Sequence, residues 1–186
     1  ESSVFKGRTP IVMNLMQNRD GLMIGFCNGF QALVKLGLVP YGEIRVPEPD
    51  APTLAMNEIG RHISMIARTK VVSNRSPWFS QVRPGDVFSI PLSHGEGRFI
   101  ADQKLINELQ ANGQVATQYV DLDDNPTMAI KYNPNGSYNA IEGITSPDGR
   151  ILGRMGHPER AVPDILKNID GNTDQKIFES GVVYFS

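Results

Sequence analysis

Residues 22–31 have the sequence LMIGFCNGFQ, and this stretch decides the fold class. Residues 22–26 form a short, continuously apolar run, which is typical of a strand buried on both faces, as in a parallel sheet. Residues 30–36 predict a helix that ends at Gly37. Between the two lies the pattern Gly-x-Cys-x-Gly, centred on Cys27. A buried strand, a sharp turn and a helix in this order indicate an α/β fold.

The turn at Cys27 has the pattern of a nucleophile elbow with cysteine in place of serine. Such a turn pushes the nucleophile out of the sheet, and we expect Gly25 and Gly29 to supply the space. The start of the following helix favours a thiolate and a developing oxyanion, and the backbone amide of Asn28 is the expected donor. The alternative is that Cys27 is a small buried apolar residue. The strand, glycines and helix together favour the nucleophile.

A thiol nucleophile needs a base, and the base needs an orienting group. His157 follows a strand predicted over residues 150–155, and chemistry in α/β folds gathers at the ends of sheet strands. Pro158 favours an extended chain at His157, in which Glu159 lies on the same side and can accept a hydrogen bond from the ring. The alternative is a surface His-Pro-Glu turn. The presence of Cys27 favours the catalytic interpretation.

A second polar stretch, SHGEGR at residues 93–98, follows a strand predicted over residues 87–92. Its two glycines let the backbone approach a ligand closely, and its charged and imidazole side chains offer polar contacts. It therefore indicates a substrate or partner loop, with a solvated turn as the alternative. The residues concerned are His94, Gly95, Glu96 and Arg98. No metal site is predicted, because His94 and Glu96 lack a third and fourth ligand. His62 is expected to be structural or at the surface.

The composition describes one globular domain and excludes several classes of protein. The 186 residues carry 18 basic and 20 acidic side chains, so the formal charge of −2 provides no basic excess for nucleic acid or an anionic membrane. No apolar run approaches the roughly 18 residues of a membrane span. The single cysteine excludes an internal disulfide framework and favours a reducing compartment. No Gly-rich phosphate loop for ATP is present.

The remaining pattern predicts further strands and helices. Residues 40–60 contain Pro40, Gly42, Pro47, Pro49 and Pro52 and are expected to be a loop. A helix is expected to start near Pro10. The other predicted strands lie at residues 63–72, 114–120 and 138–144, and the other predicted helices at residues 102–110 and 174–180.

With these residues in place, the chain resembles the class I (triad) glutamine amidotransferases. The resemblance rests on GFCNGFQ at residues 25–31 and HPER at residues 157–160, and it runs from about Arg8 to Phe185. Three longer stretches make the resemblance more specific, to the glutaminase domains of phosphoribosylformylglycinamidine synthases. They are CNGFQALVKLGLVP at residues 27–40, SHGEGR at residues 93–98 and NPNGS at residues 133–137. Such domains have a flavodoxin-like αβα sandwich with a mixed central sheet.

The resemblance implies a mechanism and a set of partners. Cys27 would attack the side-chain amide of glutamine, while His157, held by Glu159, moves the proton and releases ammonia. Gln31, Ser93 and His94 match positions near the bound substrate. The ammonia would pass to a synthetase domain or subunit in a cytoplasmic enzyme of purine biosynthesis, where ATP and Mg activate formylglycinamide ribonucleotide. This domain itself would need no cofactor. Alternatives are another cysteine hydrolase on the same fold, or a non-catalytic docking module of a synthetase.

The amino terminus departs from the family pattern. Family members begin with a strand and a Gly-rich loop that supplies a second oxyanion amide, and neither precedes the helix near Pro10. We therefore expect residues 1–186 to be a single glutamine amidotransferase domain that lacks its N-terminal strand and helix and is a C-terminal fragment of a larger chain. The resemblance alone does not imply that such a fragment is active.

Overall fold

A computed structural model describes residues 9–161 and 165–186 of the chain. Its main sheet has six strands in the order β1-β8-β7-β6-β3-β4. β1 and β8 are parallel, and the other neighbouring strands are antiparallel, so the sheet is mixed, as predicted. The strands are β1 (Met23–Phe26), β3 (Ile63–Val71), β4 (Val87–His94), β6 (Val115–Tyr119), β7 (Ile141–Thr145) and β8 (Ile151–Arg154).

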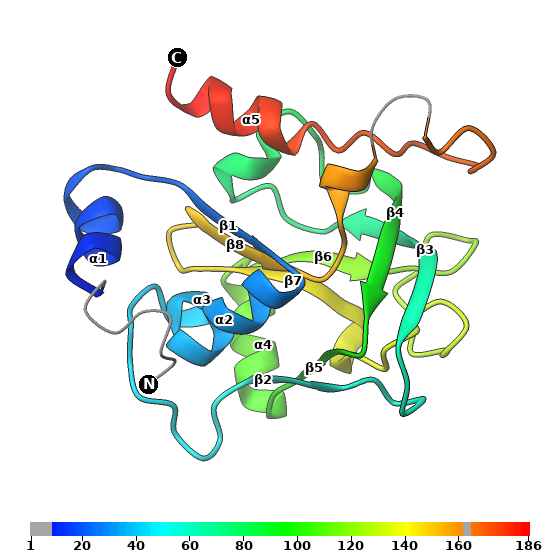
Figure 1. The fold of residues 1–186 in the computed structure, drawn as a ribbon, viewed down its shortest axis with the longest axis horizontal. Coiled ribbons are helices and arrows are strands. Elements are labelled where there is room, and N and C mark those ends of the chain that lie inside the picture. The colour runs from blue at the N-terminus through cyan, green and yellow to red at the C-terminus, as the bar shows by residue number, and fades with distance from the viewer. Residues whose placement is uncertain (1–8, 162–164) are drawn as a thin grey trace.

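Helices cover both faces of this sheet (Figure 1). One face packs against α2 (Asn28–Leu36), α3 (Leu38–Tyr41) and α4 (Gln103–Ala111), and the other against α5 (Ile177–Tyr184) and the short 3₁₀ helix η1 (Pro77–Phe79). Neighbouring residues of a strand point to opposite faces, so Ile151 joins one apolar core and Leu152 the other. The predicted αβα sandwich of the flavodoxin-like class is confirmed. Helix α1 (Thr9–Asn18) precedes β1, as predicted from Pro10.

Strand β1 corrects one expectation. Residues 22–26 were expected to form a strand buried on both faces, but Met23, Ile24 and Phe26 are only half-buried and Gly25 alone is buried. The reason is its place in the sheet: within the part of the chain that the structure describes, β1 pairs only with β8 and forms an edge.

A second, two-stranded sheet corrects the expectation that residues 40–60 and 93–98 are loops. β2 (Thr53–Met56) pairs antiparallel with β5 (Glu96–Ile100). β5 follows β4 almost directly, so the expected polar loop is reduced to a turn at Gly95. This turn carries the strand pair down from the main sheet toward the amino-terminal end of α2 (Figure 1).

The other elements fall close to their predicted places. Helix α2 starts at Asn28, two residues before the predicted start, and ends at Gly37, whose backbone is left-handed with φ 79°. The last helix lies at Ile177–Tyr184 rather than at 174–180, and β7 is preceded by a 3₁₀ turn over Tyr138–Ala140. Among the described residues, no helix combines the length and apolar character needed to cross a membrane.

Candidate active site

Cys27 sits at a strained turn between β1 and α2. Its φ of 50° and ψ of −108° lie outside the usual regions for a residue with a side chain, as expected for a nucleophile elbow. Gly25 supplies space here, because a Cβ at this position would lie 2.7 Å from the backbone carbon of Gly29. Gly29 does not, since a Cβ there would meet nothing within 4 Å. The expectation for Gly29 was therefore wrong, whereas Gly25 does allow the close approach of α2 to β1.

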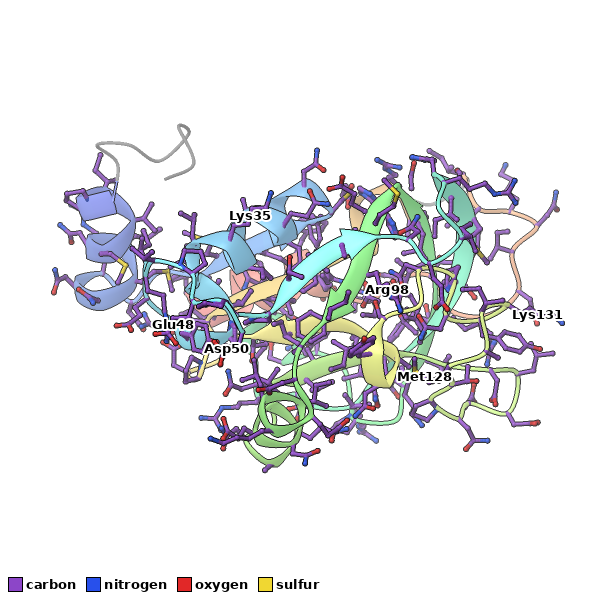
Figure 2. The ribbon with its side chains drawn as sticks, turned by 90° about the horizontal axis from the view of Figure 1, so that it is seen from below. Lys35, Glu48, Asp50, Arg98, Met128 and Lys131 are labelled. Atoms are coloured by element: carbon purple, nitrogen blue, oxygen red, sulfur yellow. The ribbon has the colours of Figure 1, made fainter. Side chains whose placement is uncertain are left out.

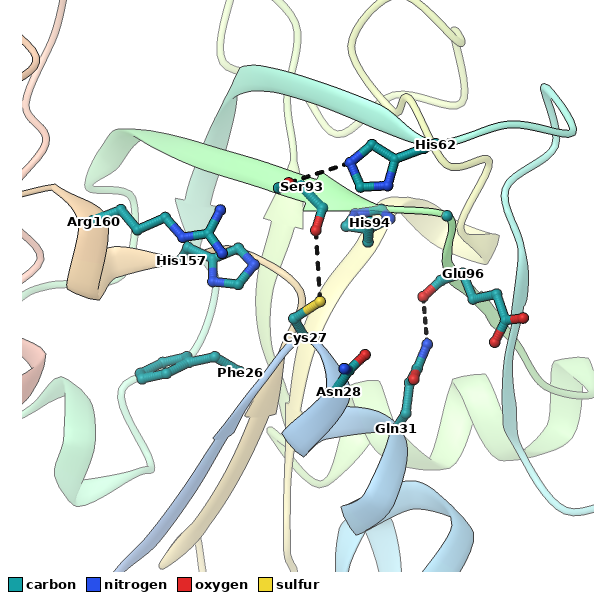
Figure 3. Close-up of a pocket in the computed structure, with 11 residues that line it drawn as sticks. Phe26, Cys27, Asn28, Gln31, His62, Ser93, His94, Glu96, His157 and Arg160 are labelled. Carbon is teal, nitrogen blue, oxygen red and sulfur yellow. Dashed lines mark hydrogen bonds between the residues drawn. The ribbon is translucent and has the colours of Figure 1, made fainter.

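The thiol opens into a pocket of about 510 Å³ at the end of the parallel pair β1 and β8. Because neighbouring parallel strands end at the same sheet edge, Cys27 after β1 and His157 after β8 come to one place (Figure 3). Most of the residues that the sequence singled out line this pocket: Cys27, Asn28, Gln31, Ser93, His94, Gly95, Glu96 and His157.

His157 is paired with Glu159, and their contact is tight. The ring Nδ1 lies 2.6 Å from Glu159 Oε1. Since a carboxylate only accepts hydrogen bonds, this contact places a proton on Nδ1, so Nε2 is the acceptor of the neutral ring. Nε2 is buried and has no partner among the described residues. The predicted contact is present, but the backbone is not extended: Pro158–Arg160 forms a 3₁₀ turn, η3.

The Cys27 side chain is a thiol rather than a thiolate. Burial raises the pKa of Cys27, and this outweighs the backbone hydrogen bond from Asn28 and the nearby charge of Arg160, which both lower it. The Sγ–H donates to the Ser93 carbonyl oxygen at 3.7 Å. A nucleophilic role for this thiol would therefore need a base that removes its proton.

A hydrogen bond joins the elbow helix to the opposite wall of the pocket. Gln31 Nε2 donates to the Glu96 carbonyl oxygen at 2.7 Å, and Figure 3 shows this bond from α2 to the start of β5. Ser93 contributes its carbonyl to the thiol and its Oγ to His62 Nε2, which is 3.2 Å away. Gln31 and Ser93 thus connect the walls of the pocket through hydrogen bonds as well as line it.

His94 is a neutral imidazole held in one tautomer. Asn57 Nδ2 donates to the carbonyl oxygens of Arg61 and His94, so its Oδ1, 3.1 Å from His94 Nδ1, must be the acceptor. Burial, together with the smaller effects of the His157 and His62 charges, lowers the pKa of His94 to about 4, against the opposing effect of Glu142. His94 can therefore accept a hydrogen bond through Nε2, and it carries no charge at neutral pH.

Arg98 lies apart from the pocket lining. Its Nε donates to the Gly136 carbonyl oxygen at 3.2 Å, and its guanidinium faces Glu58 at 4.0 Å and the Tyr138 ring. Arg98 lies on β5 and is labelled in Figure 2. The structure thus separates Arg98 from Gly95 and Glu96, which do line the pocket.

The NPNGS stretch, residues 133–137, forms hydrogen bonds with β5, the strand that follows the pocket-lining turn at Gly95. Asn135 Nδ2 donates to the Gly97 carbonyl oxygen at 2.8 Å, and Ser137 Oγ accepts from the Phe99 amide at 3.0 Å. These two bonds hold β5 in place below the turn at Gly95. The stretch therefore shapes the wall formed by residues 93–98.

Three further lining residues were not predicted as site residues. His62 was expected to be structural or at the surface; it is exposed, yet it lines the pocket beside Ser93. Phe26 and Arg160 also line it, next to Cys27 and Glu159 in the sequence. Their adjacency to the two motifs was a usable signal, whereas nothing near His62 indicated the pocket. No group of three or more His, Cys, Asp or Glu residues suited to a metal ion occurs in residues 9–161 and 165–186.

The fold and the pocket define a class: an α/β domain with a cysteine at a strand-to-helix elbow and a histidine–carboxylate pair at the adjacent strand end. Comparison with known proteins is consistent with that class. The chain belongs to the family of CobB/CobQ-like glutamine amidotransferase domains, whose model matches residues 8–185.

Individual members of this family show which kind of amidotransferase the chain resembles. The chain is 38% identical over 162 residues to "Phosphoribosylformylglycinamidine synthase subunit PurQ" of Gloeobacter violaceus, covering 87% of this chain and 63% of that protein. It is 36% identical over 174 residues to the protein of the same name from Salinibacter ruber, covering 92% and 67%. The structure of PurLQS from Thermotoga maritima matches with a TM-score of 0.69 and 26% identity, covering 95% of this chain and 66% of that one.

These relatives confirm the resemblance to the glutaminase domains of phosphoribosylformylglycinamidine synthases. The chain nevertheless spans less than two thirds of the Gloeobacter relative's length.

Proposed function

We propose that this chain hydrolyses glutamine to glutamate and ammonia, with Cys27 as nucleophile, His157 as general base and Glu159 as the group that orients the base. The single observation that carries the proposal is that Cys27, at a strained elbow, and His157 line one pocket, with His157 Nδ1 2.6 Å from Glu159 Oε1.

The first half-reaction follows from the protonation states at the site. In the neutral form of His157 that carries its proton on Nδ1, Nε2 takes the thiol proton as Sγ attacks the carboxamide carbon of glutamine. The backbone N–H of Asn28 donates to the oxyanion that forms. The tetrahedral intermediate collapses, its C–N bond breaks, and the proton on His157 passes to the leaving nitrogen. The products are ammonia and a glutamyl thioester on Cys27.

The second half-reaction uses the same groups. His157 removes a proton from a water molecule, whose oxygen attacks the thioester carbon. The C–S bond breaks and the sulfur takes the proton back from His157, which releases glutamate and restores the thiol. Glu159 keeps Nδ1 protonated in both halves, so Nε2 always faces the reacting atoms.

The other pocket residues bind substrate in this proposal. Gln31, Ser93 and His94 contact the bound glutamine, with His94 as an uncharged acceptor. The turn at Gly95 and Glu96 is the part of the pocket wall that a partner can reach. Arg98, which lies outside the lining, belongs to the same partner face rather than to the glutamine site.

The wider function is inferred from the names of the relatives. The ammonia serves the ATP-dependent conversion of formylglycinamide ribonucleotide to formylglycinamidine ribonucleotide in purine biosynthesis. The partner is then a synthetase domain or subunit, which binds the ATP and Mg, while this domain needs neither. Cytoplasmic purine synthesis is the corresponding setting.

The test is covalent labelling of the intact protein by a diazo-ketone analogue of glutamine. We expect label on Cys27 alone, protection by glutamine, and loss of both labelling and glutamate release in Cys27→Ser. Lys35→Gln, on the last turn of α2 and exposed, is the matched control and should behave as the unsubstituted protein. Labelling that glutamine does not slow would indicate another cysteine hydrolase. Absence of both labelling and glutamate release would indicate a docking module.

A further inference from the structure

A buried ion pair lies next to the strand end that carries His157. Glu142 on β7 and Arg154 on β8 are both 0% exposed, and Arg154 Nη2 lies 2.8 Å from Glu142 Oε2. Removing two charges from water costs as much as their attraction returns, so two apolar residues would stabilise the sheet at least as well. Stability therefore does not explain this pair.

The Glu142 carboxylate is fully occupied by donors. Oε2 accepts from Thr117 Oγ1 at 2.5 Å and from Arg154 Nη2, and Oε1 accepts from Arg154 Nε at 3.2 Å. The fourth donor is the backbone N–H of Gly156, 2.6 Å from Oε1. A carboxylate has about four acceptor positions, so a glutamine here would leave at least one of these donors without an acceptor.

The fourth bond reaches the catalytic segment. Gly156 directly precedes His157, and the amide before it, Met155 N–H, donates to the Glu142 backbone oxygen at 3.1 Å. The His157 amide then donates to the Pro91 oxygen at 2.9 Å. Three successive amides are thus fixed, and the Glu142 side chain holds the one that directly precedes His157.

The surroundings of Gly156 leave no room for a side chain at that position. A Cβ on Gly156 would lie 2.7 Å from Ile90 Cγ2 and 2.9 Å from Glu142 Oε1. Arg154 extends the network in the other direction, since its Nη1 donates to Oε1 of Gln175, which is 2% exposed and lies just before α5. The ion pair therefore joins the sheet, the His157 segment and the C-terminal segment at one point.

We propose that Glu142 and Arg154 are positioning residues for His157: Glu142 holds the Gly156 amide, and Arg154 holds the Glu142 carboxylate. The proposal rests on the proposed function, because it gives His157 the role of base. Its consequence is that rate and stability respond differently to changes at these two positions.

Two variants of the intact protein separate positioning from stability. Glu142→Gln should lower kcat for glutamate release on the order of 10²-fold, the scale of a displacement of about 1 Å at a reacting group, with little change in KM. The double variant E142L/R154M leaves no buried charge, so its Tm should return toward the unsubstituted value while its kcat stays low. Asp124→Asn is the control, because Asp124 is half exposed, pairs with Arg68 and is not part of the pocket lining.

The outcomes distinguish this proposal from the proposed function. Recovery of kcat together with Tm in E142L/R154M, or an unchanged kcat in Glu142→Gln, would overturn the positioning role alone. An unsubstituted protein that releases no glutamate overturns the proposed function. In that case, the pH dependence of Cys27 alkylation by iodoacetamide still reports the imidazole beside the thiol. It should shift in Glu142→Gln but not in Asp124→Asn, and an unshifted profile would overturn the positioning role.

Discussion

Replacing Gly25 with alanine perturbs the elbow at its tightest contact. Gly25 is paired with Gly153 across the parallel strands β1 and β8, and α2 packs directly over both. A Cβ on Gly25 would lie 2.7 Å from the Gly29 carbonyl carbon and 2.8 Å from its oxygen. These are backbone atoms of α2, so they cannot swing aside as the end of a flexible side chain would.

The size of the effect follows from that geometry. Ordinary van der Waals contact begins at 3.4 Å, so the amino-terminal end of α2 must move by about 0.7 Å. Overpacking of this kind costs about 1–3 kcal/mol. In a chain of this length each kcal/mol lowers Tm by roughly 2–4 °C. The same movement displaces the Asn28 amide from the oxyanion, which should reduce kcat by up to about 10²-fold.

Thermal melting and steady-state glutamate release measure the two effects, and Gly29→Ala is the matched control. A Cβ on Gly29 has open space, and alanine is more favourable than glycine in a helix by up to about 1 kcal/mol. We therefore expect Gly29→Ala to melt at the same temperature or higher and to keep its activity. If Gly25→Ala melts and turns over like the unsubstituted protein, the close approach of α2 to β1 does not set the elbow, and the reasoning fails.

Three further predictions concern the pocket wall and α4. Because burial lowers the pKa of His94 from 6.5 to about 4, the unfolded chain binds a proton there that the folded chain does not. Stability should therefore fall as the pH drops through this range, on the order of 3 kcal/mol in total, and urea unfolding of His94→Gln should lack that part of the fall. Gly97→Ala should raise KM for glutamine, since its Cβ would lie 2.4 Å from His94 Cε1; an unchanged KM would argue against His94 as a substrate contact. Asp102 Oδ1 accepts from the Leu105 amide at 2.6 Å as the N-cap of α4, so Asp102→Ala should cost about 1 kcal/mol in urea unfolding without changing kcat.

The parts of the site that the sequence predicts depend on local structure. The elbow needs only β1, Cys27 and α2, which are consecutive in the chain, and the end of α2 at Gly37 follows from one residue's left-handed backbone. The His157–Glu159 contact spans two residues, so it forms although the chain adopts a 3₁₀ turn instead of the expected extended form. Residue type and short spacing are enough in both cases.

The parts that sequence patterns miss depend on pairing between distant residues. β2 is a four-residue strand after three prolines, and β5 begins at Glu96-Gly97, so neither has a strong strand pattern by itself. Each exists because it pairs with the other. The pocket wall has the same origin, since Gln31 bonds to Glu96 across 65 residues.

Distance along the chain also limits what a motif can say about charge. The sequence SHGEGR offers His94 as one of several polar side chains, and its spacing contains nothing that decides whether the imidazole is charged. The charge is decided chiefly by burial, while Asn57, 37 residues earlier, fixes the tautomer of the neutral ring. A motif can therefore identify which residue faces the ligand, whereas the protonation state that the chemistry requires is set by the tertiary structure around it.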